Sequence, residues 1–257
     1  MSNWFHCFSP KLNATLRLFC FHYGGGGASA FRDWHELLPH HVEVICVQFP
    51  GRESRFPEPL ISDLNEICSQ IIKEIQPYLN KPFVFFGHSL GALITHHVSA
   101  RLMNCGLRTP ETIIVSGRSA PQDDEVYYKK ITHLPDDEFV ENLKEYGGTP
   151  ELILENTELM NVYVPILRSD FLVSESKERV PGKVSFPIAV FGGFQDKMSE
   201  QKLSQWQHET TKSCSVTMFS GNHFFINQNK DEVLKTVAEL LANVTNTKQQ
   251  NASFLMK

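Results

Sequence analysis

The chain has 257 residues, of which 41% are hydrophobic and 21% are charged, and this composition excludes a collagen-like, coiled-coil or mostly disordered protein. Its formal net charge of −5 argues against binding to nucleic acid or to an anionic membrane through overall positive charge. The N-terminus lacks the basic and then apolar pattern of a signal peptide, and no run reaches the roughly 18 apolar residues of a membrane helix. A cytoplasmic protein is therefore expected.

A mainly parallel sheet is predicted by the alternation of short apolar runs with helical patterns along most of the chain. The runs are Leu16–His22, Val42–Phe49, Pro82–Gly87, Thr112–Ser116, Phe186–Gly192 and Cys214–Phe219. Each has the length and composition of a strand that is buried on both faces. The expected fold class is α/β, with the central sheet flanked by helices.

Four consecutive glycines follow the first apolar run and precede a helical pattern. One interpretation is dinucleotide binding, because Gly25-x-Gly27-x-x-Ala30 fits the G-x-G-x-x-G/A pattern. That pattern needs an acidic residue at the end of the next strand, where Gln48 and its neighbours are uncharged. The other interpretation is an oxyanion-binding loop, in which bare backbone lets an N–H group such as that of Gly24 reach a substrate oxygen.

An amphipathic helix is predicted between the second and third runs. Apolar residues recur with helical spacing from Leu64 to Leu79. Asp63 immediately precedes this stripe and is a suitable N-cap, and Pro82 opens the next strand.

The third run leads into Gly87-His88-Ser89-Leu90-Gly91, which matches G-x-S-x-G and is followed by a helical pattern. A strand–turn–helix setting is what a nucleophile elbow requires, because the serine occupies a strained turn and the flanking glycines let strand and helix approach closely. Ser89 is therefore the candidate nucleophile, and the Leu90 N–H at the helix start is a candidate oxyanion donor. His88 is expected to point away from the nucleophile.

From about residue 117 to 182 the alternation stops. This stretch contains helical patterns over Asp136–Tyr146 and Thr157–Val173 but no convincing strand. An insertion of this length in a sheet with otherwise short connections is typical of a lid over a site, although it is also compatible with a second packing layer. We predict a single domain over residues 1–244 with this helical lid, followed by a disordered tail over 245–257.

A serine hydroxyl needs a positioned base and an orienting carboxylate before it can attack, and in this fold they follow in the order serine, acid, histidine. His223 is the candidate base because it lies in the loop after the last predicted strand. Asp196 is the candidate acid because it leaves the end of the preceding strand. Asp170, in the helical insertion, and Asp231, on the final helix, are weaker alternatives.

Metal chemistry is not expected. His35-Glu36 resembles the start of H-E-x-x-H, but His40 comes one position late and Pro39 would interrupt the helix. The cysteines occur singly, without ligand spacing. A monomer is expected because no unexplained apolar stripe remains.

The chain resembles the type II thioesterases of non-ribosomal peptide and polyketide synthesis, an α/β-hydrolase group, over almost its whole length. The segments that carry the resemblance are Leu18–Gly25, Phe31–Trp34, Gln48–Arg55, Phe86–Ala92, Val115–Arg118, Tyr146–Pro150, Pro165–Asp170 and Gly221–Phe225. It implies an α/β-hydrolase fold with Ser89 as nucleophile, Asp196 as acid and His223 as base. The family's first loop usually reads Phe-Pro-Tyr-Ala-Gly-Gly, so here His22 replaces the proline and Gly24 the alanine.

The resemblance also implies hydrolysis of acyl or peptidyl thioesters from the phosphopantetheine arm of a carrier protein. The arm arrives with the substrate, so no cofactor of the enzyme itself is expected. Leu154, Met160, Tyr163 and Leu167 of the insertion are candidates for lining the acyl site. Arg118, Lys129 and Lys130 are candidates for docking an acidic carrier protein.

Two alternatives remain open from the sequence. A carboxylesterase or lipase uses the same triad on the same scaffold. A non-catalytic binding protein with a hydrolase fold would share the scaffold without turnover.

Overall fold

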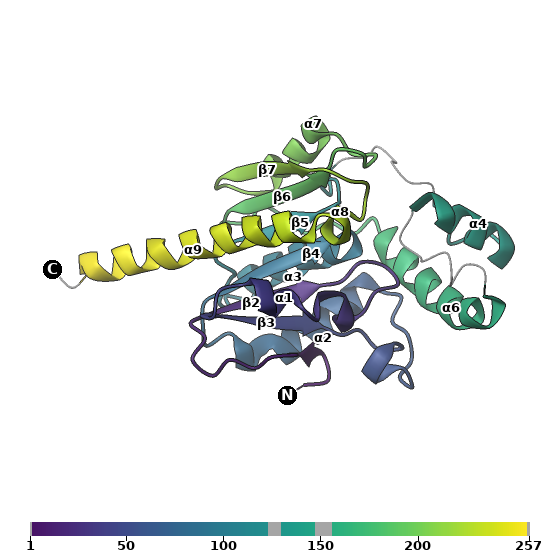
Figure 1. Ribbon diagram of the computed structural model, residues 1–257, viewed down its shortest axis with the longest axis horizontal. Helices are drawn as coiled ribbons and strands as arrows, with labels where there is room; N and C mark the ends of the chain where they lie inside the picture. The colour runs from purple at the N-terminus through teal and green to yellow at the C-terminus, as the bar shows by residue number, and fades with distance from the viewer. Residues whose placement is uncertain (1, 123–129, 147–155, 256–257) are drawn as a thin grey trace.

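The computed structural model describes residues 2–122, 130–146 and 156–255, without the side chains of 145, 146 and 247–255. Its centre is a seven-stranded sheet in the order β1-β3-β2-β4-β5-β6-β7 (Figure 1). The strands are β1 (Phe5–His6), β2 (Leu16–Phe21), β3 (Val42–Val47), β4 (Phe83–His88), β5 (Ile113–Ser116), β6 (Ile188–Gly193) and β7 (Cys214–Phe219). All neighbouring pairs are parallel except β1 with β3, so the predicted parallel sheet is confirmed.

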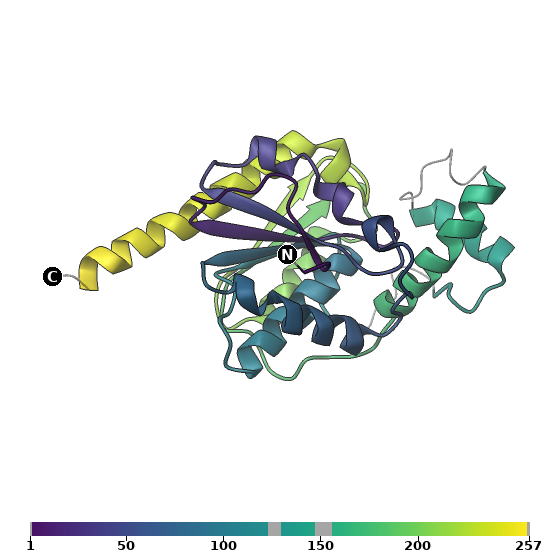
Figure 2. The same cartoon turned by 90° about the horizontal axis from the view of Figure 1, so that it is seen from below.

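Helices cover both faces of the sheet, which explains why its inner strands are apolar throughout (Figures 1 and 2). Along β2, Phe19 and Phe21 enter one hydrophobic core with α2 (Leu64–Ile75) and α3 (Leu90–Asn104). Leu18 and Cys20 enter the opposite core with α1 (Trp34–Leu37) and α9 (Lys230–Leu255). Short helices α7 (Glu200–Leu203) and α8 (Phe225–Gln228) complete the C-terminal part.

The N-cap predicted for the first long helix is present. The Asp63 carboxylate accepts a hydrogen bond of 2.7 Å from the Glu66 N–H. The regular helix α2 ends at Ile75, and a 3-10 turn, Gln76–Tyr78, carries the chain on towards β4. The predicted helix was longer than α2 because the apolar stripe continues through the 3-10 turn to Leu79.

The segment that connects β5 to β6 contains two helices that lie outside the main body (Figures 1 and 2). They are α4 (Asp136–Tyr146) and α6 (Thr157–Ser174), at the positions predicted from the sequence. Buried apolar side chains of these helices and of the segment before α4 form a hydrophobic cluster separate from the two cores of the sheet. The members are Ile131, Phe139, Leu143, Met160, Val164 and Leu167. We refer to α4 and α6 together as the cap.

The C-terminal segment differs from its prediction. Residues 245–257 were expected to lack regular structure, but α9 continues as one helix to Leu255 and projects from the body (Figure 1). Val233, Val237 and Leu241 anchor the start of α9 in the core. Once a helix is nucleated, extension through a segment that contains neither glycine nor proline costs little.

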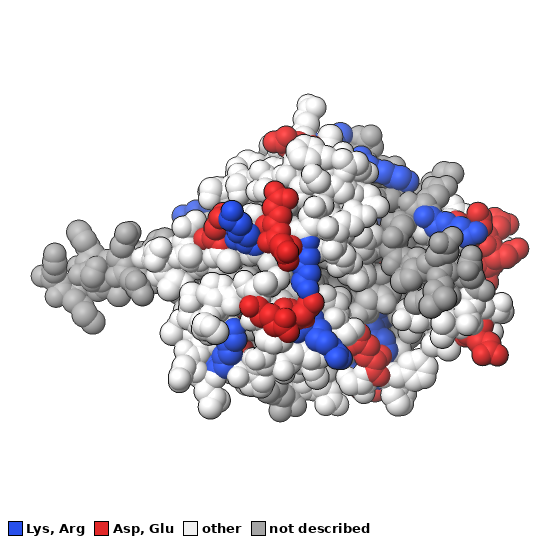
Figure 3. Space-filling view, in the orientation of Figure 1, with Lys and Arg blue, Asp and Glu red and all other residues white. Residues whose placement is uncertain are grey.

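The six cysteines are free thiols. Within the part of the chain that the structure describes, no helix is both long enough and apolar enough to cross a membrane. Charged side chains of both signs are interspersed on the face shown in Figure 3, and acidic ones gather over α4. That helix carries Asp136, Asp137, Glu138 and Glu141.

Candidate active site

Ser89 occupies a strained turn between β4 and α3, as the G-x-S-x-G motif predicts. Its φ of 54° and ψ of −112° lie in a region that L residues rarely adopt. A Cβ atom added at Gly87 would lie 2.2 Å from the Gly91 carbonyl oxygen, and one added at Gly91 would lie 2.1 Å from the Phe21 oxygen. Only glycine therefore fits at either position, and the close packing presents the half-buried Ser89 at the carboxyl end of β4.

Asp196 and His223 are joined directly. The His223 Nδ1 lies 2.9 Å from an Asp196 carboxylate oxygen. Both side chains are nearly inaccessible, at 9% and 1% exposure for His223 and Asp196 respectively. They come from loops after β6 and β7, as predicted. With Nδ1 facing the carboxylate, Nε2 is the ring nitrogen that can accept a proton.

The end of β5 and the residue after it lie between the nucleophile and the base. The Ser89 N–H donates a 2.8 Å hydrogen bond to the Ser116 carbonyl. A Cβ atom added at the next residue, Gly117, would lie 3.3 Å from the His223 Cε1. The carboxyl ends of β4, β5, β6 and β7 thus bring Ser89, Asp196 and His223 to one edge of the sheet.

The glycine loop after β2, residues 24–27, has two of its four N–H groups occupied by described acceptors. The Gly25 N–H donates to Asp170 at 2.7 Å, and the Gly26 N–H donates to the Tyr23 carbonyl at 3.0 Å. Among the acceptors that the structure describes, none takes the Gly24 N–H. Leu90 is the first residue of α3, so its N–H lacks an intrahelical acceptor. Among the described residues, the N–H groups of Gly24, Gly27 and Leu90 therefore have no protein acceptor.

The same loop argues against dinucleotide binding. Gln48, where an acidic residue would be needed, accepts a hydrogen bond from the Ala28 N–H at 2.9 Å. The Glu53 carboxylate approaches Gly27 and accepts hydrogen bonds from both the N–H and the hydroxyl of Ser29. A carboxylate at this turn would repel a pyrophosphate.

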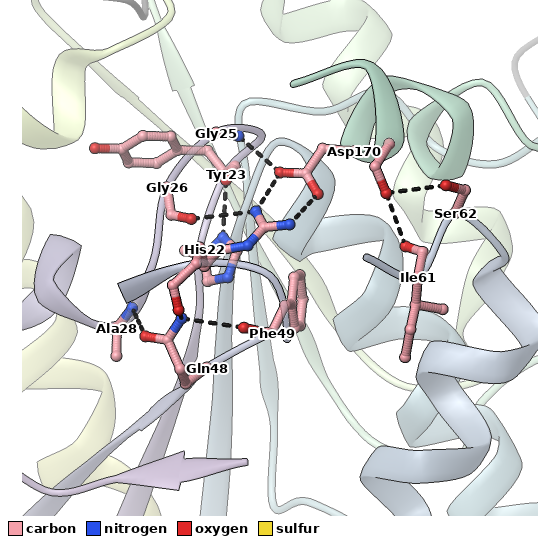
Figure 4. A network of polar contacts seen from close by, with 12 residues as sticks. His22, Tyr23, Gly25, Gly26, Ala28, Gln48, Phe49, Ile61, Ser62 and Asp170 are labelled. Atoms are coloured by element: carbon pink, nitrogen blue, oxygen red, sulfur yellow. Dashed lines mark hydrogen bonds and ion pairs between the residues drawn. The ribbon is translucent and has the colours of Figure 1, made fainter. Parts of the chain in front are cut away.

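Asp170, the alternative acid, belongs to a buried ion pair instead (Figure 4). The Arg52 guanidinium donates to its two carboxylate oxygens at 2.5 and 2.8 Å, and both side chains are at most 5% exposed. Arg52 also donates to the Gly26 carbonyl at 3.3 Å. Burial, and then the nearby Arg52 charge, lowers the pKa of His22 to about 4, so the ring under this pair is neutral.

This ion pair attaches the cap to the glycine loop. Asp170 lies on α6 and accepts the Gly25 N–H, and Arg52, which follows β3, donates to the Gly26 carbonyl. The next residue towards the N-terminus of α6, Ser169, donates to the Ile61 carbonyl at 3.1 Å (Figure 4). Sequence reasoning missed the role of Arg52. The only available signal was its place in one of the segments that carry the family resemblance.

The cap residues proposed to line the acyl site have different surroundings. Leu167 covers the glycine loop, since its Cδ2 would lie 2.6 Å from a Cβ atom on Gly25. Met160 is buried in the cap cluster and Tyr163 packs against it, while Leu154 lies outside the described residues. Phe171, which the sequence did not single out, lies 3.9 Å from the Cβ position of Gly24.

His88 lies beside the base, with its ring centroid 5.1 Å from that of His223. One of the expected docking residues needs correction. Arg118 is not a free docking residue, because its guanidinium donates to the hydroxyl and carbonyl of Ser174 at the end of α6. Lys130 points its ammonium at the Glu175 carbonyl, and Lys129 lies outside the described residues.

Comparisons with known proteins point to one family. The model of the thioesterase domain family matches residues 16–241. The gramicidin S biosynthesis protein GrsT of Aneurinibacillus migulanus is 38% identical over 94% of both chains. The thioesterase PikA5 of Streptomyces venezuelae is 32% identical, covering 93% of this chain and 85% of its own.

A solved structure has the same architecture. The thioesterase RedJ of the prodiginine pathway in Streptomyces coelicolor superposes with a TM-score of 0.82 and 29% sequence identity. The superposition covers 90% of this chain and 92% of RedJ. The similarity therefore extends over most of the fold.

Proposed function

Because the chain belongs to the thioesterase domain family, we propose that it uses Ser89, His223 and Asp196 to release acyl or peptidyl groups from carrier proteins of a peptide or polyketide assembly line. It is a hydrolase of thioester bonds with an α/β-hydrolase fold, and the resemblance to type II thioesterases is confirmed. The observation that carries the proposed site is the buried 2.9 Å contact of His223 with Asp196 beside a serine held in a strained turn.

In the proposed acylation step, the Ser89 hydroxyl attacks the thioester carbonyl while His223 Nε2 accepts its proton. Asp196 holds the ring in the required tautomer and stabilises the imidazolium that forms. The carbonyl oxygen becomes an anion, which the Leu90 and Gly24 N–H groups bind. Breaking the carbon–sulfur bond then expels the carrier's thiolate, a good leaving group because the pKa of a thiol is near 8.5, and the proton on His223 passes to this sulfur.

Deacylation returns the enzyme to its starting state. His223 removes a proton from water, which attacks the acyl–Ser89 ester at the same carbonyl carbon. Collapse of the second tetrahedral intermediate returns the proton to the Ser89 oxygen and releases the acid. Because the Ser89 alkoxide is a poorer leaving group than a thiolate, we expect deacylation to limit turnover.

The partner is a carrier protein whose phosphopantetheine arm delivers the acyl group, and no cofactor resident in the enzyme takes part. The direct support is that GrsT acts in the biosynthesis of gramicidin S. Leu167 and Phe171 of α6 cover the glycine loop, so we expect them to contact the acyl group. The proposal places the enzyme in the cytoplasm as a monomer, away from membranes and nucleic acid.

A comparison of matched substrates tests the thioester carrier as the true substrate. One acyl group is presented on a carrier protein, on free pantetheine and as an oxygen ester, and kcat/KM is measured for each. The proposal predicts the highest kcat/KM for the carrier-bound thioester. Equal or better hydrolysis of the oxygen ester would favour a carboxylesterase, and absence of turnover on all three would favour a binding protein.

A further inference from the structure

His88 lies directly beside the base but has no part in the mechanism above. It is the last residue of β4, it is fully buried, and a hydrogen bond of 2.9 Å joins its Nδ1 to the Ser116 hydroxyl oxygen. Its ring and that of His223 are tilted by 43° with centroids 5.1 Å apart. The His88 ring therefore forms one wall of the space that holds the base.

Gly117 shows how closely the two rings are packed. Its φ of 61° already favours glycine. A Cβ atom there would lie 2.6 Å from the His88 Cε1 and 3.3 Å from the His223 Cε1. The two rings thus both pack against a residue without a side chain, and a side chain at this position would crowd them both.

Ser116 connects this arrangement to the nucleophile. Its carbonyl accepts the 2.8 Å hydrogen bond from the Ser89 N–H, and its hydroxyl holds His88. A continuous route therefore runs from the Ser89 backbone through Ser116 and His88 to the ring of His223. This route is separate from the hydrogen bond that the Ser89 hydroxyl donates to His223 in the proposed mechanism.

The surroundings of His88 keep its ring in place and uncharged. Tyr23, Phe224 and Phe225 surround it with ring centroids 5.6–5.9 Å away. Burial, and then the neighbouring His223, lowers the pKa of His88 well below its ordinary value. A neutral neighbour does not repel the positive charge that His223 acquires when it accepts the serine proton.

We propose that His88, held by the Ser116 hydroxyl, is a positioning residue that keeps the His223 ring oriented towards Ser89. This inference rests on the proposed roles of Ser89 and His223. Because His88 touches neither the acyl group nor the carrier, its loss should lower the rate of Ser89 attack and leave substrate binding unchanged.

The test uses His88→Phe, which keeps a ring but loses the bond to Ser116, and Ser116→Ala, which deletes only the hydroxyl. The rate of Ser89 labelling by a fluorophosphonate is measured together with kcat and KM on an acyl-pantetheine thioester. Each variant should lose about tenfold to a hundredfold in labelling rate and in kcat, with little change in KM. The double variant should be no slower than the slower single variant, because both substitutions break the same bond.

His97→Phe is the matched control, because His97 is a buried histidine of α3 outside this route. This variant should label at the wild-type rate. Labelling of both Ser116→Ala and His88→Phe at the wild-type rate would overturn the inference, whatever their melting temperatures. If His88→Phe does not fold, Ser116→Ala decides alone. Failure of the wild-type protein to label would instead contradict the proposed function.

Discussion

Gly24 and Gly25 are neighbours with different tolerance for a side chain. A Cβ atom on Gly24 would meet Asp170 and Phe171 at 3.8 and 3.9 Å, which are ordinary contact distances. At Gly25 the φ is 75° and the added atom would lie 2.6 Å from Leu167. The difference follows from position, because Gly25 lies beneath the cap and supplies its N–H to Asp170.

Gly25→Ala should therefore impair the protein more than Gly24→Ala. The left-handed conformation alone costs an alanine about 1–2 kcal/mol. The clash with Leu167 adds to this cost and should displace the glycine loop. Urea denaturation measures the first effect and kcat the second. Equal stability and equal kcat for the two variants would contradict the described loop geometry.

Asp196 and Asp231 provide a second contrast at the scale of residues. Asp196→Asn should keep the fold but lower kcat by about 10⁴, because an amide favours the wrong tautomer of His223. Asp231→Asn, in the first turn of α9, should leave kcat unchanged. Steady-state kinetics on an acyl-pantetheine thioester distinguish the two, and a small effect of Asp196→Asn would remove it from the triad.

Sequence order alone located the Asp196 and His223 loops, because parallel strands bring their carboxyl ends to one edge. It did not predict that Gly25 and Gly26 have their N–H groups occupied. Nor did it predict the contact of His88 with His223, since alternation along β4 gives the direction of a side chain but not what another loop packs against it. These features depend on loops that meet only in the folded chain.

At the scale of elements, the C-terminal half of α6 is attached to the body by polar contacts. Asp170 binds the Arg52 guanidinium and the Gly25 N–H. Ser169 donates to the Ile61 carbonyl, and Ser174 accepts a hydrogen bond from Arg118. The preceding turns of α6 pack against α4 in the cap cluster. The cap is therefore anchored at the end of α6 that lies over the glycine loop.

Asp170→Ala should destabilise the protein by about 3–5 kcal/mol, because it leaves the Arg52 guanidinium buried without its partner. Asp136→Ala is the matched control, since Asp136 also pairs with an arginine, Arg168, but is 76% exposed. Its effect should be below about 1 kcal/mol. Denaturant titrations of both variants check the contrast, and a similar small loss for both would show that the Arg52 pair contributes little.

The helices of the cap were predictable because their apolar spacing is local, and α4 and α6 have nearly the predicted bounds. β1 was missed because two residues, Phe5 and His6, are too few to show a periodicity. The Arg52–Asp170 pair was missed for another reason. Its members are 118 positions apart, and nothing local distinguishes a buried arginine from an exposed one.

At the scale of the whole molecule, buried neutral histidines make stability depend on pH. Burial lowers the pKa of His22 and His97 to about 4 and that of His96 to about 3, from an ordinary value of 6.5. His88 is shifted in the same direction. Between pH 6.5 and about 4 the unfolded chain therefore binds protons that the folded chain does not.

Stability should consequently fall as the pH is lowered below 6.5 and should not gain from these groups above it. Each such histidine contributes a slope of up to about 1.4 kcal/mol per pH unit. Urea denaturation at a series of pH values gives the slope, and His97→Phe should reduce it by close to one proton. An unchanged slope in that variant would mean that His97 is protonated in the folded protein.

The central claim is that Ser89 takes the acyl group from a carrier-bound thioester and passes it to water. Intact mass spectrometry of a panel of acyl-loaded carrier proteins, before and after incubation with the enzyme, tests it most directly. The wild-type protein should return carriers to the mass of the free phosphopantetheine thiol, whereas Ser89→Ala should leave the acyl mass in place. Acyl carriers that survive the wild-type protein, or that lose the acyl group equally well with Ser89→Ala, would contradict the account.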